Sequence, residues 1–310
     1  MTISVITPSF QQGRFIERTI KSVFNQQKNN AAYDIEYIVI DGGSTDQTLA
    51  ILQKYEHRLS WISEPDEGQA YAVNKGLAMS TGEIIAWINS DDVYYPQAFE
   101  QVFSFFKTNP QVAVVYGQAD WIDETDNVIA PYPTRPWSYN QLTKECYLCQ
   151  PAVFFRRSVV ERLGGLESRL QYCMDYELWL RYGQAFPFSY LLTKLAGSRM
   201  YATNKTLGCR LAAHKEANYM LRSRLGYSTR HWIFEYSKLQ LNSDNSVKET
   251  AFSLVVRLLI LSAKNCCKFN KNALIVVVLK VMIDQMPGGR FWMRSHSRPV
   301  IEDIILKQDL

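Results

Sequence analysis

The stretch Glu83–Tyr95 constrains the fold of this chain more than any other segment. Within it, Ile84–Ile88 is an uninterrupted apolar run, which is typical of a strand buried on both faces of an α/β sheet. The run ends abruptly in the polar sequence Asn89–Asp92. Ligands of open α/β sheets bind at the carboxyl ends of the strands. We therefore expect a binding site where this strand ends.

The adjacent carboxylates of Asp91 and Asp92 need a positive charge nearby, because like charges at a strand end repel each other. Oxygen ligands of this kind suit Mg²⁺ or Mn²⁺, and Mg²⁺ usually binds through one or two carboxylates together with substrate phosphates. The pair therefore predicts a site for Mg²⁺ or Mn²⁺. A structural alternative is that Asp92 caps a helix that begins near Pro96.

The first 120 residues alternate between apolar strand patterns and segments with a helical spacing of apolar residues. The predicted strands are Ile3–Thr7, Ile35–Ile40, Leu59–Ile62, Ile84–Ile88 and Val112–Tyr116. The predicted helices are Arg14–Gln27, Thr48–Tyr55, a helix that carries Ala70, Val73, Leu77 and Met79, and Gln97–Lys107. Such alternation predicts an α/β fold with a mostly parallel sheet and right-handed crossovers.

Three of these strands end in polar or acidic clusters, at Thr7–Phe10, Asp41–Asp46 and Asn89–Asp92. Clusters that converge on one sheet edge indicate a single site. The glycine-rich signatures of dinucleotide-binding proteins and of P-loop proteins are both missing. Without those cradles, a diphosphate has to be bound by a cation that acidic residues coordinate. The pattern therefore indicates a nucleotide whose charge is met by a metal ion.

The region from Trp121 to about Tyr201 is less regular. It predicts a strand after Gln150-Pro151, a helix over Val159–Leu163, a helix around residues 172–181, and one or two strands in Phe188–Tyr201.

Two acids lie near the start of the predicted helix around residues 172–181. Asp175 is at a position where an acid favours the helix dipole, so capping is its structural alternative. Glu177 and Arg181 have the i, i+4 spacing of a surface ion pair, which favours that role over catalysis.

Seven motifs occur in the order and spacing of family 2 glycosyltransferases, which this chain resembles over roughly residues 2–200. The motifs are Thr7-Pro-Ser-Phe10, Asp41-Gly-Gly-Ser-Thr-Asp46, Ser63-Glu-Pro-Asp-Glu-Gly-Gln69, Asn74-Lys-Gly76, Asn89-Ser-Asp-Asp92, Gln150-Pro-Ala152 and Met174-Asp-Tyr176. Each motif alone is weak, whereas the ordered set is specific. The resemblance implies a GT-A fold, which is Rossmann-like, and the transfer of a sugar from a nucleotide-sugar with inversion at the anomeric carbon.

The resemblance also implies roles for individual residues. The nucleotide-sugar is expected to contact Thr7, Pro8, Phe10, Asp41, Asp66, Asn74, Lys75, Asp91 and Asp92. Among these, Phe10 would lie against the base, and Asp41 and Asp66 would contact the nucleoside. Asp91 and Asp92 match the metal and diphosphate position, whose usual first acid is replaced here by Asn89.

Asp175 matches the family's catalytic base, although its usual glutamate neighbour is Met174 in this chain. A carboxylate at this position would accept the proton of the acceptor hydroxyl. Positioned bases of this kind contribute about 10²–10⁴-fold to the rate.

The charge and cysteine patterns narrow the choice of compartment and partner. The net charge of +4 is too small to favour nucleic acid. The chain starts in a strand pattern and not in a secretory signal, so a reduced, cytoplasmic protein is expected. The lone Cys146-Tyr-Leu-Cys149 pattern has no second pair, which argues against a zinc or redox site.

The resemblance fades after Asn204. His214–Lys238 predicts a helix, and Ala251–Ile283 is very apolar but interrupted by charges, with uncharged runs shorter than the roughly 18 residues of a membrane span. Residues 251–310 have a charge balance of +5, whereas the preceding 250 residues have −1.

A basic stripe is predicted on this apolar tail. On a helix, the residues Ser253, Arg257, Lys264, Lys268 and Lys271 fall within about 60° of one another. Phe291–Arg294 adds aromatic and basic residues of the kind found at membrane interfaces. Such a helix either packs on the catalytic domain or lies in a membrane interface.

These observations predict a catalytic domain over residues 1–203 and a helical region over residues 204–310. The expected function is that of an inverting, metal-dependent glycosyltransferase in bacterial surface polysaccharide or glycolipid synthesis. Its expected partners are a nucleotide-sugar, a saccharide or lipid-linked saccharide acceptor, and the cytoplasmic face of the inner membrane.

Two other functions were weighed. A non-catalytic nucleotide-sugar-binding module would not need Asp175. A nucleotidyltransferase would want a phosphate loop rich in glycine and lysine near the first strand, where residues 8–14 supply one Gly and one Arg.

Overall fold

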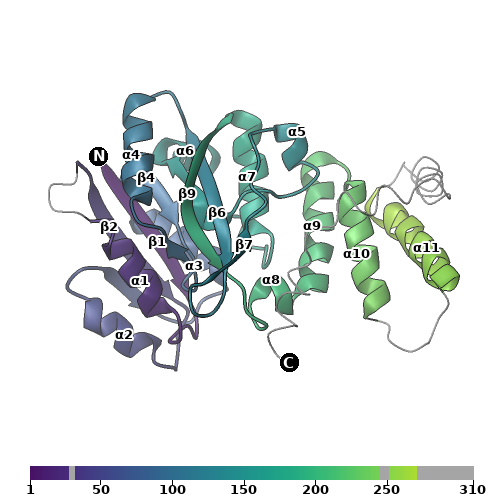
Figure 1. Cartoon of the computed structure of the whole chain (residues 1–310), viewed down its shortest axis with the longest axis horizontal. Coiled ribbons are helices and arrows are strands. Elements are labelled where there is room, and N and C mark those ends of the chain that lie inside the picture. The colour runs from purple at the N-terminus through teal and green to yellow at the C-terminus, as the bar shows by residue number, and fades with distance from the viewer. Residues whose placement is uncertain (28–31, 244–250, 271–310) are drawn as a thin grey trace. The chain divides into compact units, whose positions relative to one another are not determined.

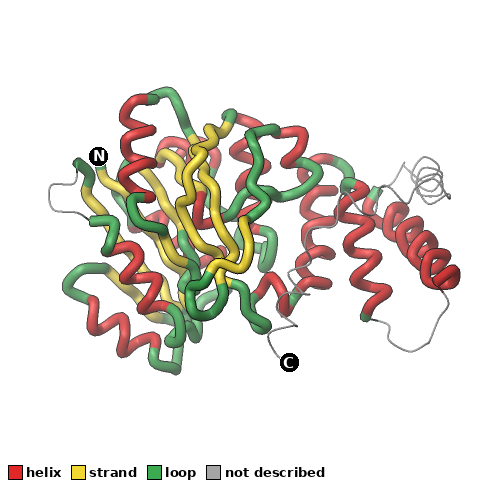
Figure 2. Tube along the Cα trace, in the orientation of Figure 1, coloured by secondary structure: helices red, strands yellow, loops and turns green. Residues whose placement is uncertain are grey.

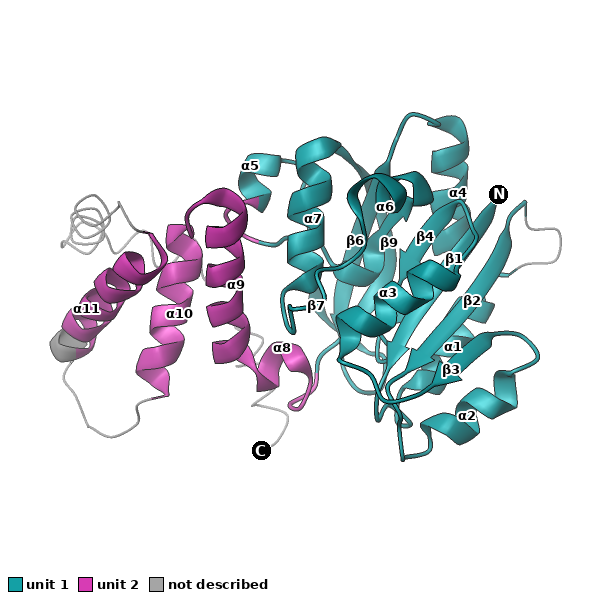
Figure 3. Cartoon of the chain, turned by 180° about the vertical axis from the view of Figure 1, so that it is seen from behind, with its two compact units in different colours: residues 1–142, 146–200 teal, residues 143–145, 201–310 magenta. Residues whose placement is uncertain are grey.

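The computed structural model describes residues 1–27, 32–243 and 251–270. Three predicted features lie outside these residues. They are Lys271 of the basic stripe, the end of the apolar segment Ala251–Ile283, and the sequence Phe291–Arg294. Two compact units divide the chain (Figure 3). The first consists of Met1–Leu142 and Cys146–Met200, and the second of Thr143–Glu145 and the residues from Tyr201 onward. The expected boundary between residues 203 and 204 falls just after this division.

The first unit is built on one sheet with helices packed along it (Figures 1 and 2). Its strands are β1 (Thr2–Ser9), β2 (Asp34–Asp41), β3 (Ser60–Ser63), β4 (Ile84–Trp87), β5 (Val93–Tyr94), β6 (Val114–Ile122), β7 (Val128–Pro131), β8 (Val153–Arg156) and β9 (Phe188–Arg199). Its helices are α1 (Ile16–Phe24), α2 (Thr48–Tyr55), α3 (Gln69–Met79), α4 (Ala98–Thr108), α5 (Tyr139–Leu142), the single turn η1 (Gln150–Ala152), α6 (Arg157–Leu163) and α7 (Met174–Ala185).

The strand order in the described residues is β3-β2-β1-β4-β8-β6-β9-β5, with β7 paired to β6. The four strands from β3 to β4 are all parallel, as the alternation of strand and helix predicts. Beyond β4 the sheet is mixed, because β8 runs antiparallel to β4 and to β6, whereas β6 and β9 are parallel. The first half of the sheet therefore has the architecture of an open α/β sheet, with its strand ends on one edge.

The register of the parallel strands brings the predicted polar clusters together. Ser9, the last residue of β1, pairs with Asp41 at the end of β2, and Asp41 pairs with Ser63 at the end of β3. On the other side of β1, Ile6 pairs with Trp87, the last residue of β4. All residues of β4 are buried, as expected for the central strand of such a sheet.

The second unit is helical in its described part. Its helices are α8 (Lys205–Gly208), α9 (Arg210–Leu225), α10 (Arg230–Asn242) and α11 (Ala251–Phe269). The prediction of one helix over His214–Lys238 is wrong, because α9 ends at Leu225 and the following Gly226 has a left-handed φ of 81°. A glycine in this conformation is the common way to stop a helix. In the described residues, no helix is long and apolar enough to span a membrane.

Helix α11 packs against α10 through its second half. The buried residues Ser262, Asn265, Cys266 and Phe269 recur at helical spacing on one face. Cys266 and Phe269 join Ile233 and Tyr236 of α10 in one apolar cluster, and the Asn265 Nδ2 donates hydrogen bonds to Ser237 Oγ at 3.0 Å and Gln240 Oε1 at 2.6 Å. This half of α11 therefore packs on a helix of its own unit, while the expected packing on the catalytic domain stays a prediction.

Gly226 provides a test of how the α9–α10 turn is specified. We predict that Gly226→Ala lowers the free energy of unfolding by about 1–2 kcal/mol, because a side chain disfavours the left-handed region. A Cβ there would contact nothing within 4 Å, so strain is the sole expected cost. Gly226→Asn should cost less, since Asn tolerates this conformation. Urea denaturation followed by circular dichroism measures the difference, and equal stability of the Ala variant and the wild type would contradict this account.

Candidate active site

The ends of β1 to β4 form the edge at which the predicted site residues lie. Phe10 follows β1 and is 61% exposed, so its ring is available to a ligand. Thr7 is fully buried, and its Oγ1 lies 3.2 Å from the Tyr37 hydroxyl in a hydrogen bond. Pro8 is also buried within β1. Of the three residues predicted here, the structure therefore leaves the side chain of Phe10 in a position to contact a nucleotide.

The Asp41 carboxylate is buried and organises the loop that follows β2. Its Oδ2 accepts hydrogen bonds from Ser44 N at 2.8 Å, Gly43 N at 3.1 Å and Ser63 Oγ at 2.7 Å, and its Oδ1 accepts one from Ser44 Oγ at 2.6 Å. Both oxygens are thus bonded inside the protein. In the structure this side chain supports the loop, and its contact with a nucleoside stays a prediction.

Asp66 lies where the loops after β2 and β3 meet. Its Oδ1 accepts a hydrogen bond from Gly68 N at 2.8 Å, just before α3. A Cβ added to Gly42 would lie 3.1 Å from either Asp66 carboxylate oxygen, so only glycine allows this close approach. The side chain is half-buried. Asp66 is therefore better placed than Asp41 to contact a ligand at this edge.

Asn74 and Lys75 on α3 are engaged by other segments of the protein. Asn74 Nδ2 donates to Leu166 O at 2.9 Å and to Ser168 Oγ at 3.2 Å, while its Oδ1 accepts from Leu166 N at 2.8 Å. Lys75 forms an ion pair with Glu64 in the loop after β3. Direct contact of Asn74 with a nucleotide-sugar is not favoured, because its amide anchors the segment after α6.

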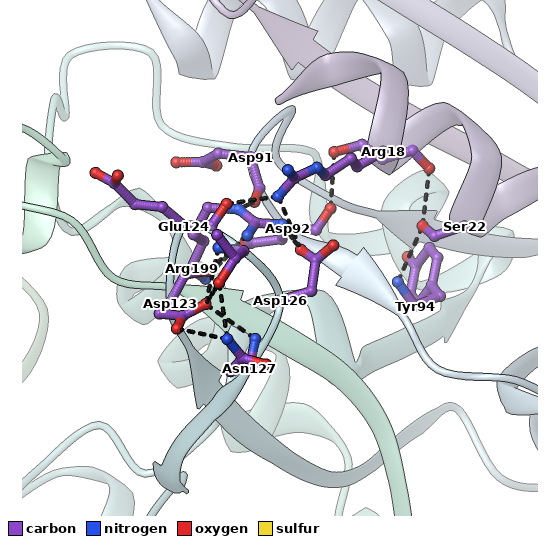
Figure 4. A network of polar contacts seen from close by, with 12 residues as sticks. Arg18, Ser22, Asp91, Asp92, Tyr94, Asp123, Glu124, Asp126, Asn127 and Arg199 are labelled. Carbon is purple, nitrogen blue, oxygen red and sulfur yellow. Dashed lines mark hydrogen bonds and ion pairs between the residues drawn. The ribbon is translucent and has the colours of Figure 1, made fainter. Parts of the chain in front are cut away.

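The acidic loop, which we define as Asn89–Asp92, separates its two carboxylates. Asp92 is 3% exposed, and its Oδ1 accepts a hydrogen bond from Arg199 N at 2.8 Å. The helix-capping alternative for Asp92 is wrong, since α4 begins at Ala98 after Gln97. Asp91 is only half-buried. Figure 4 shows the Asp91 side chain extending from the loop. The geometry therefore favours Asp91 over Asp92 as the ligand of a cation.

Two amides fix the start of the acidic loop. Asn89 Oδ1 accepts a hydrogen bond from Gln69 Nε2 of α3 at 2.6 Å, and its Nδ2 lies 3.4 Å from Asp92 Oδ2. Gln150 Nε2 donates to the Trp87 carbonyl at 2.5 Å, at the end of β4. These contacts connect the loop to α3 and to η1. They also occupy both ends of the Asn89 amide, which agrees with Asp91 as the principal ligand.

The electrostatics of the acidic loop favour a nearby cation. Burial raises the pKa of the Asp92 carboxyl well above its usual value, and the charge of Asp91 raises it further. Hydrogen bonds from Arg199 N and the Ser198 hydroxyl oppose the rise. In the described residues, no group of three or more His, Cys, Asp or Glu side chains could by itself bind a metal. A Mg²⁺ or Mn²⁺ ion with one carboxylate and phosphate oxygens does not require such a group.

Asp175 is in the first turn of α7, whose N-cap is Cys173. Its Oδ1 accepts a hydrogen bond from Tyr176 N at 2.7 Å, and the side chain is half-buried. The carboxylate therefore does not occupy the capping position that its structural alternative requires. Its place in the first turn still suits an acid, because the helix N-terminus is partially positive.

Two observations relate Asp175 and the segment before α7 to the same edge. Burial raises the pKa of the Cys149 thiol well above its usual value, and the charges of Asp92, Cys146, Asp175 and Asp120 add to the effect in that order. Asp92 and Asp175 are thus both neighbours of one buried sulfur. A Cβ on Gly68 would lie 3.0 Å from Gln171 Oε1, so the segment before α7 also touches the turn before α3.

Glu177 forms the predicted pair with Arg181, but the pair is not on the surface. Glu177 is 1% exposed, and the guanidinium donates to both carboxylate oxygens, at 3.1 and 2.9 Å. Arg181 also donates to the carbonyls of Leu163, Gly164 and Gly165 at the end of α6. The prediction of a surface pair is therefore wrong, because the i, i+4 spacing does not reveal which helix face is covered.

Arg199, at the end of β9, is a residue of this site that the sequence motifs do not include. Its side chain is fully buried, and its Nε donates to the Asp91 carbonyl at 2.7 Å. One signal in the sequence could have found it: an arginine at the end of the apolar segment Leu195–Met200 is buried only if it is paired.

Cys146 is half-buried, Cys149 is buried, and neither is in a disulfide. The expectation that this lone CxxC pattern is not a zinc or redox site stays a prediction.

Comparison with known proteins identifies the family to which this sequence is similar. The family model described as "Glycosyl transferase family 2" matches residues 4–164. The chondroitin synthase of Escherichia coli is 26% identical over 244 residues, which are 76% of this chain and 34% of that protein. An uncharacterized glycosyltransferase of Mycobacterium tuberculosis H37Rv is 33% identical over 183 residues, which are 58% of this chain and 68% of that protein. The chain thus spans about a third of the chondroitin synthase.

Solved structures share the fold at low sequence identity. Staphylococcus aureus TarS 1–349 in complex with UDP-GlcNAc has a TM-score of 0.60 and 14% identity, over 96% of this chain and 93% of that one. The mannosyltransferase PcManGT of Pyrobaculum calidifontis, in complex with GDP-Man and Mn²⁺, has a TM-score of 0.56 and 14% identity, over 92% of this chain and 87% of that one. The mixed sheet with flanking helices is therefore the Rossmann-like GT-A fold that the motifs imply. With the family model covering more than half of its length, the chain belongs to glycosyl transferase family 2.

Proposed function

We propose that this protein is an inverting, metal-dependent glycosyltransferase that moves a sugar from a nucleotide-sugar to a hydroxyl acceptor. The observation that carries the proposal is the half-buried Asp91 carboxylate at the end of β4. It lies on the edge formed with β1 and β2, where the exposed ring of Phe10 could stack on a base. Asp175 lies in the first turn of α7, and its charge, like that of Asp92, acts on the buried Cys149 thiol. These features support the proposal that the donor, metal and base residues all belong to the first unit.

The metal site in this proposal uses Asp91 as its protein ligand. Its residue chemistry fits Mg²⁺ or Mn²⁺, since carboxylate oxygen and diphosphate oxygen are both hard ligands. When bound, the ion neutralises the charge that develops on the departing nucleoside diphosphate. Asp92 supports the site indirectly. Its buried carboxylate accepts a hydrogen bond from Arg199 N, and this bond fixes the backbone beside Asp91.

Asp175 acts as the general base in this proposal. Its carboxylate accepts the proton of the acceptor hydroxyl while the hydroxyl oxygen attacks the anomeric carbon from the face opposite the leaving group. One bond to the anomeric carbon forms as the bond to the diphosphate oxygen breaks, so the configuration inverts. The proton ends on Asp175, and the negative charge on the nucleoside diphosphate.

The acceptor in this proposal is a saccharide or a lipid-linked saccharide, in the synthesis of a bacterial surface polysaccharide or glycolipid at the cytoplasmic face of the inner membrane. The support comes from relatives, one of which is a chondroitin synthase, while a neighbour in structure binds UDP-GlcNAc. The donor is in this view a nucleoside-diphosphate sugar.

The second unit offers a surface for peripheral contact with an anionic membrane. The first half of α11 exposes Leu254, Val255, Val256 and Ile260, between 36% and 49% each. The cations Lys264 and Lys268 are exposed further along the same helix. A cavity of about 450 Å³ also lies against this helix, lined by Leu211, Gln240, Ser243, Arg257, Ile260, Leu261 and Lys264. Apolar residues beside cations are typical of helices that bind at a membrane interface.

The metal proposal predicts that Asp91→Ala abolishes sugar transfer and sharply weakens binding of the nucleotide-sugar, because it removes the protein ligand of the ion. Asp34→Ala is the matched control, since Asp34 is exposed at the opposite end of β2. Transfer is measured with a panel of nucleotide-sugars in the presence of Mn²⁺. Full activity of the wild type in excess EDTA would refute the metal requirement.

The base proposal predicts that Asp175→Asn lowers the turnover rate by about 10²-fold or more, because the amide cannot accept the proton. Fold and donor affinity should change little, since Asn suits the first turn of a helix and the base contacts the acceptor. Donor affinity from calorimetry and turnover at saturating donor are measured on one preparation. A variant that transfers sugar within a few-fold of the wild type would assign Asp175 to a structural role.

The membrane proposal predicts that Lys264→Glu with Lys268→Glu weakens binding to vesicles that contain anionic lipid by more than about tenfold, because each cation near such a surface contributes about 1 kcal/mol. Lys107→Glu with Lys144→Glu is a control of equal charge at exposed sites outside α11. Vesicle co-sedimentation at low salt measures the difference. If the wild type itself remains in the supernatant, α11 is a packing element alone.

A further inference from the structure

The buried side chain of Arg199 connects three segments around the acidic loop (Figure 4). Its Nε donates to the Asp91 carbonyl at 2.7 Å, its Nη1 donates to the Asp123 carbonyl at 2.6 Å, and its Nη2 forms an ion pair with the Asp126 carboxylate. Its guanidinium also lies over the Phe15 ring at 4.9 Å, beside the start of α1. From this geometry we propose that Arg199 is a positioning residue that sets the affinity of Asp91 for the divalent ion.

The backbone of Arg199 adds to the contact that its side chain makes. Arg199 N donates to Asp92 Oδ1 at 2.8 Å, so one residue fixes both members of the acidic pair. Thr19 Oγ1 of α1 donates to the Asp92 carbonyl at 2.7 Å from the other side. The backbone that carries the Asp91 carboxylate is thus bonded on both flanks. The backbone position of the half-buried Asp91 carboxylate is thereby fixed.

The chemistry of arginine suits this role better than that of lysine. A guanidinium has five N–H donors in a fixed plane, whereas an ammonium is a compact point charge on a flexible chain. Here the plane reaches two backbone carbonyls and one carboxylate in three directions. A lysine at this position would conserve the charge but could not make all three contacts in one geometry.

The buried charge of Arg199 makes the arrangement sensitive to the β6–β7 turn, which we define as residues 123–127. A buried cation is costly unless it is paired, and the carboxylate that pairs with Arg199 belongs to Asp126, whose side chain is 43% exposed. Asp126 has a left-handed φ of 75°. Asn favours that region as well as Asp does, so the charge can be removed there without a change of backbone.

Asp123 stabilises the same turn from within. Its Oδ1 accepts hydrogen bonds from Thr125 N at 2.8 Å and Asn127 N at 2.9 Å, and its Oδ2 accepts one from Asn127 Nδ2 at 3.0 Å. Burial raises the pKa of Asp123, but hydrogen bonds from Asn127 and Thr125 outweigh it and lower the value to about 2. The internal hydrogen bonds of Asp123 therefore persist throughout the neutral range.

This inference rests on the proposed metal site, and residues outside the first coordination shell of a metal commonly change its affinity by about 10–100-fold. We predict that Arg199→Lys and Arg199→Met weaken Mn²⁺ binding by about that factor. The free Mn²⁺ concentration, followed by electron paramagnetic resonance during a titration, measures the affinity without any turnover. Unfolding by urea of the same proteins measures their stability.

Arg156, a half-buried arginine that also donates to backbone carbonyls, offers a control for the loss of a guanidinium. Its Nε and Nη2 donate to the carbonyls of Val112 at 2.8 Å and Phe106 at 2.9 Å, and it lies over the Phe106 ring at 4.8 Å. It pairs with Ile84 at the opposite end of β4 from the acidic loop. Arg156→Met should lower stability in the same way as Arg199→Met while leaving the Mn²⁺ affinity unchanged.

A second variant keeps the proposal testable if Arg199→Met does not fold. Asp126→Asn removes the ionic partner of Arg199 but leaves its two carbonyl contacts. We expect a weaker Mn²⁺ affinity by a factor of up to about five, as for a partly exposed pair.

The outcomes separate this inference from the proposed function. Arg199 variants that bind Mn²⁺ within twofold of the wild type would overturn it, as would an equal loss in Arg156→Met. If the wild type binds no Mn²⁺ even in the presence of a nucleoside diphosphate, both the inference and the metal proposal fail. If Mn²⁺ affinity falls as predicted in the Arg199 variants but the wild type transfers no sugar from any nucleotide-sugar of a panel, the inference stands and the proposed function fails.

Discussion

Two carboxylates, Asp41 at the end of β2 and Asp92 in the loop after β4, are buried on either side of β1, and the rest of the site depends on the hydrogen bonds that satisfy them. A buried carboxylate is unstable unless donors surround it. Asp41 is satisfied by the loop that follows it, through Gly43 N and Ser44 N. Asp92 is satisfied from a distant strand, through Arg199 N. In both cases the donors fix the backbone next to the edge where a ligand would bind.

Because of this constraint, the polar residues at the edge fall into two groups. Thr7, Asp41 and Asn74 support the architecture, since the side chain of each forms hydrogen bonds with other residues of the protein. Phe10 and Asp91 are left partly or largely exposed beside them. A motif of a family can thus contain residues of two kinds, and burial distinguishes those that could touch a ligand from those that position them.

The sequence alone predicts the part of the fold that is local. Strands followed by helices in the first 120 residues predict the parallel half of the sheet, because each βαβ unit is specified by short-range patterns. The mixed half was less readable, since β8 is short and pairs with β4 and β6 across long stretches of chain. The break between α9 and α10 was missed because a lone Gly226 in a polar helix pattern is a weak signal.

The same limit applies to the candidate site. Asp91 and Asp175 could be selected from spacing, because they belong to ordered motifs. The contact of Arg199 with the acidic loop could not be predicted from spacing, since 107 residues separate Arg199 from Asp92, to which it donates a hydrogen bond. Whether the Glu177 pair is covered depends on what packs over α7, which spacing does not encode. Burial and long-range pairing are properties of the folded chain.

The central claim is that a divalent ion joins Asp91 to the diphosphate of a nucleotide donor, and thermodynamic coupling tests it most directly. If one ion contacts both, Mn²⁺ and a nucleoside diphosphate must each raise the affinity of the protein for the other by the same factor. Calorimetric titration of Mn²⁺ with and without the nucleotide measures that factor. We predict a factor well above one in the wild type that falls to one in Asp91→Ala. Independent binding of the two ligands in the wild type would contradict this account.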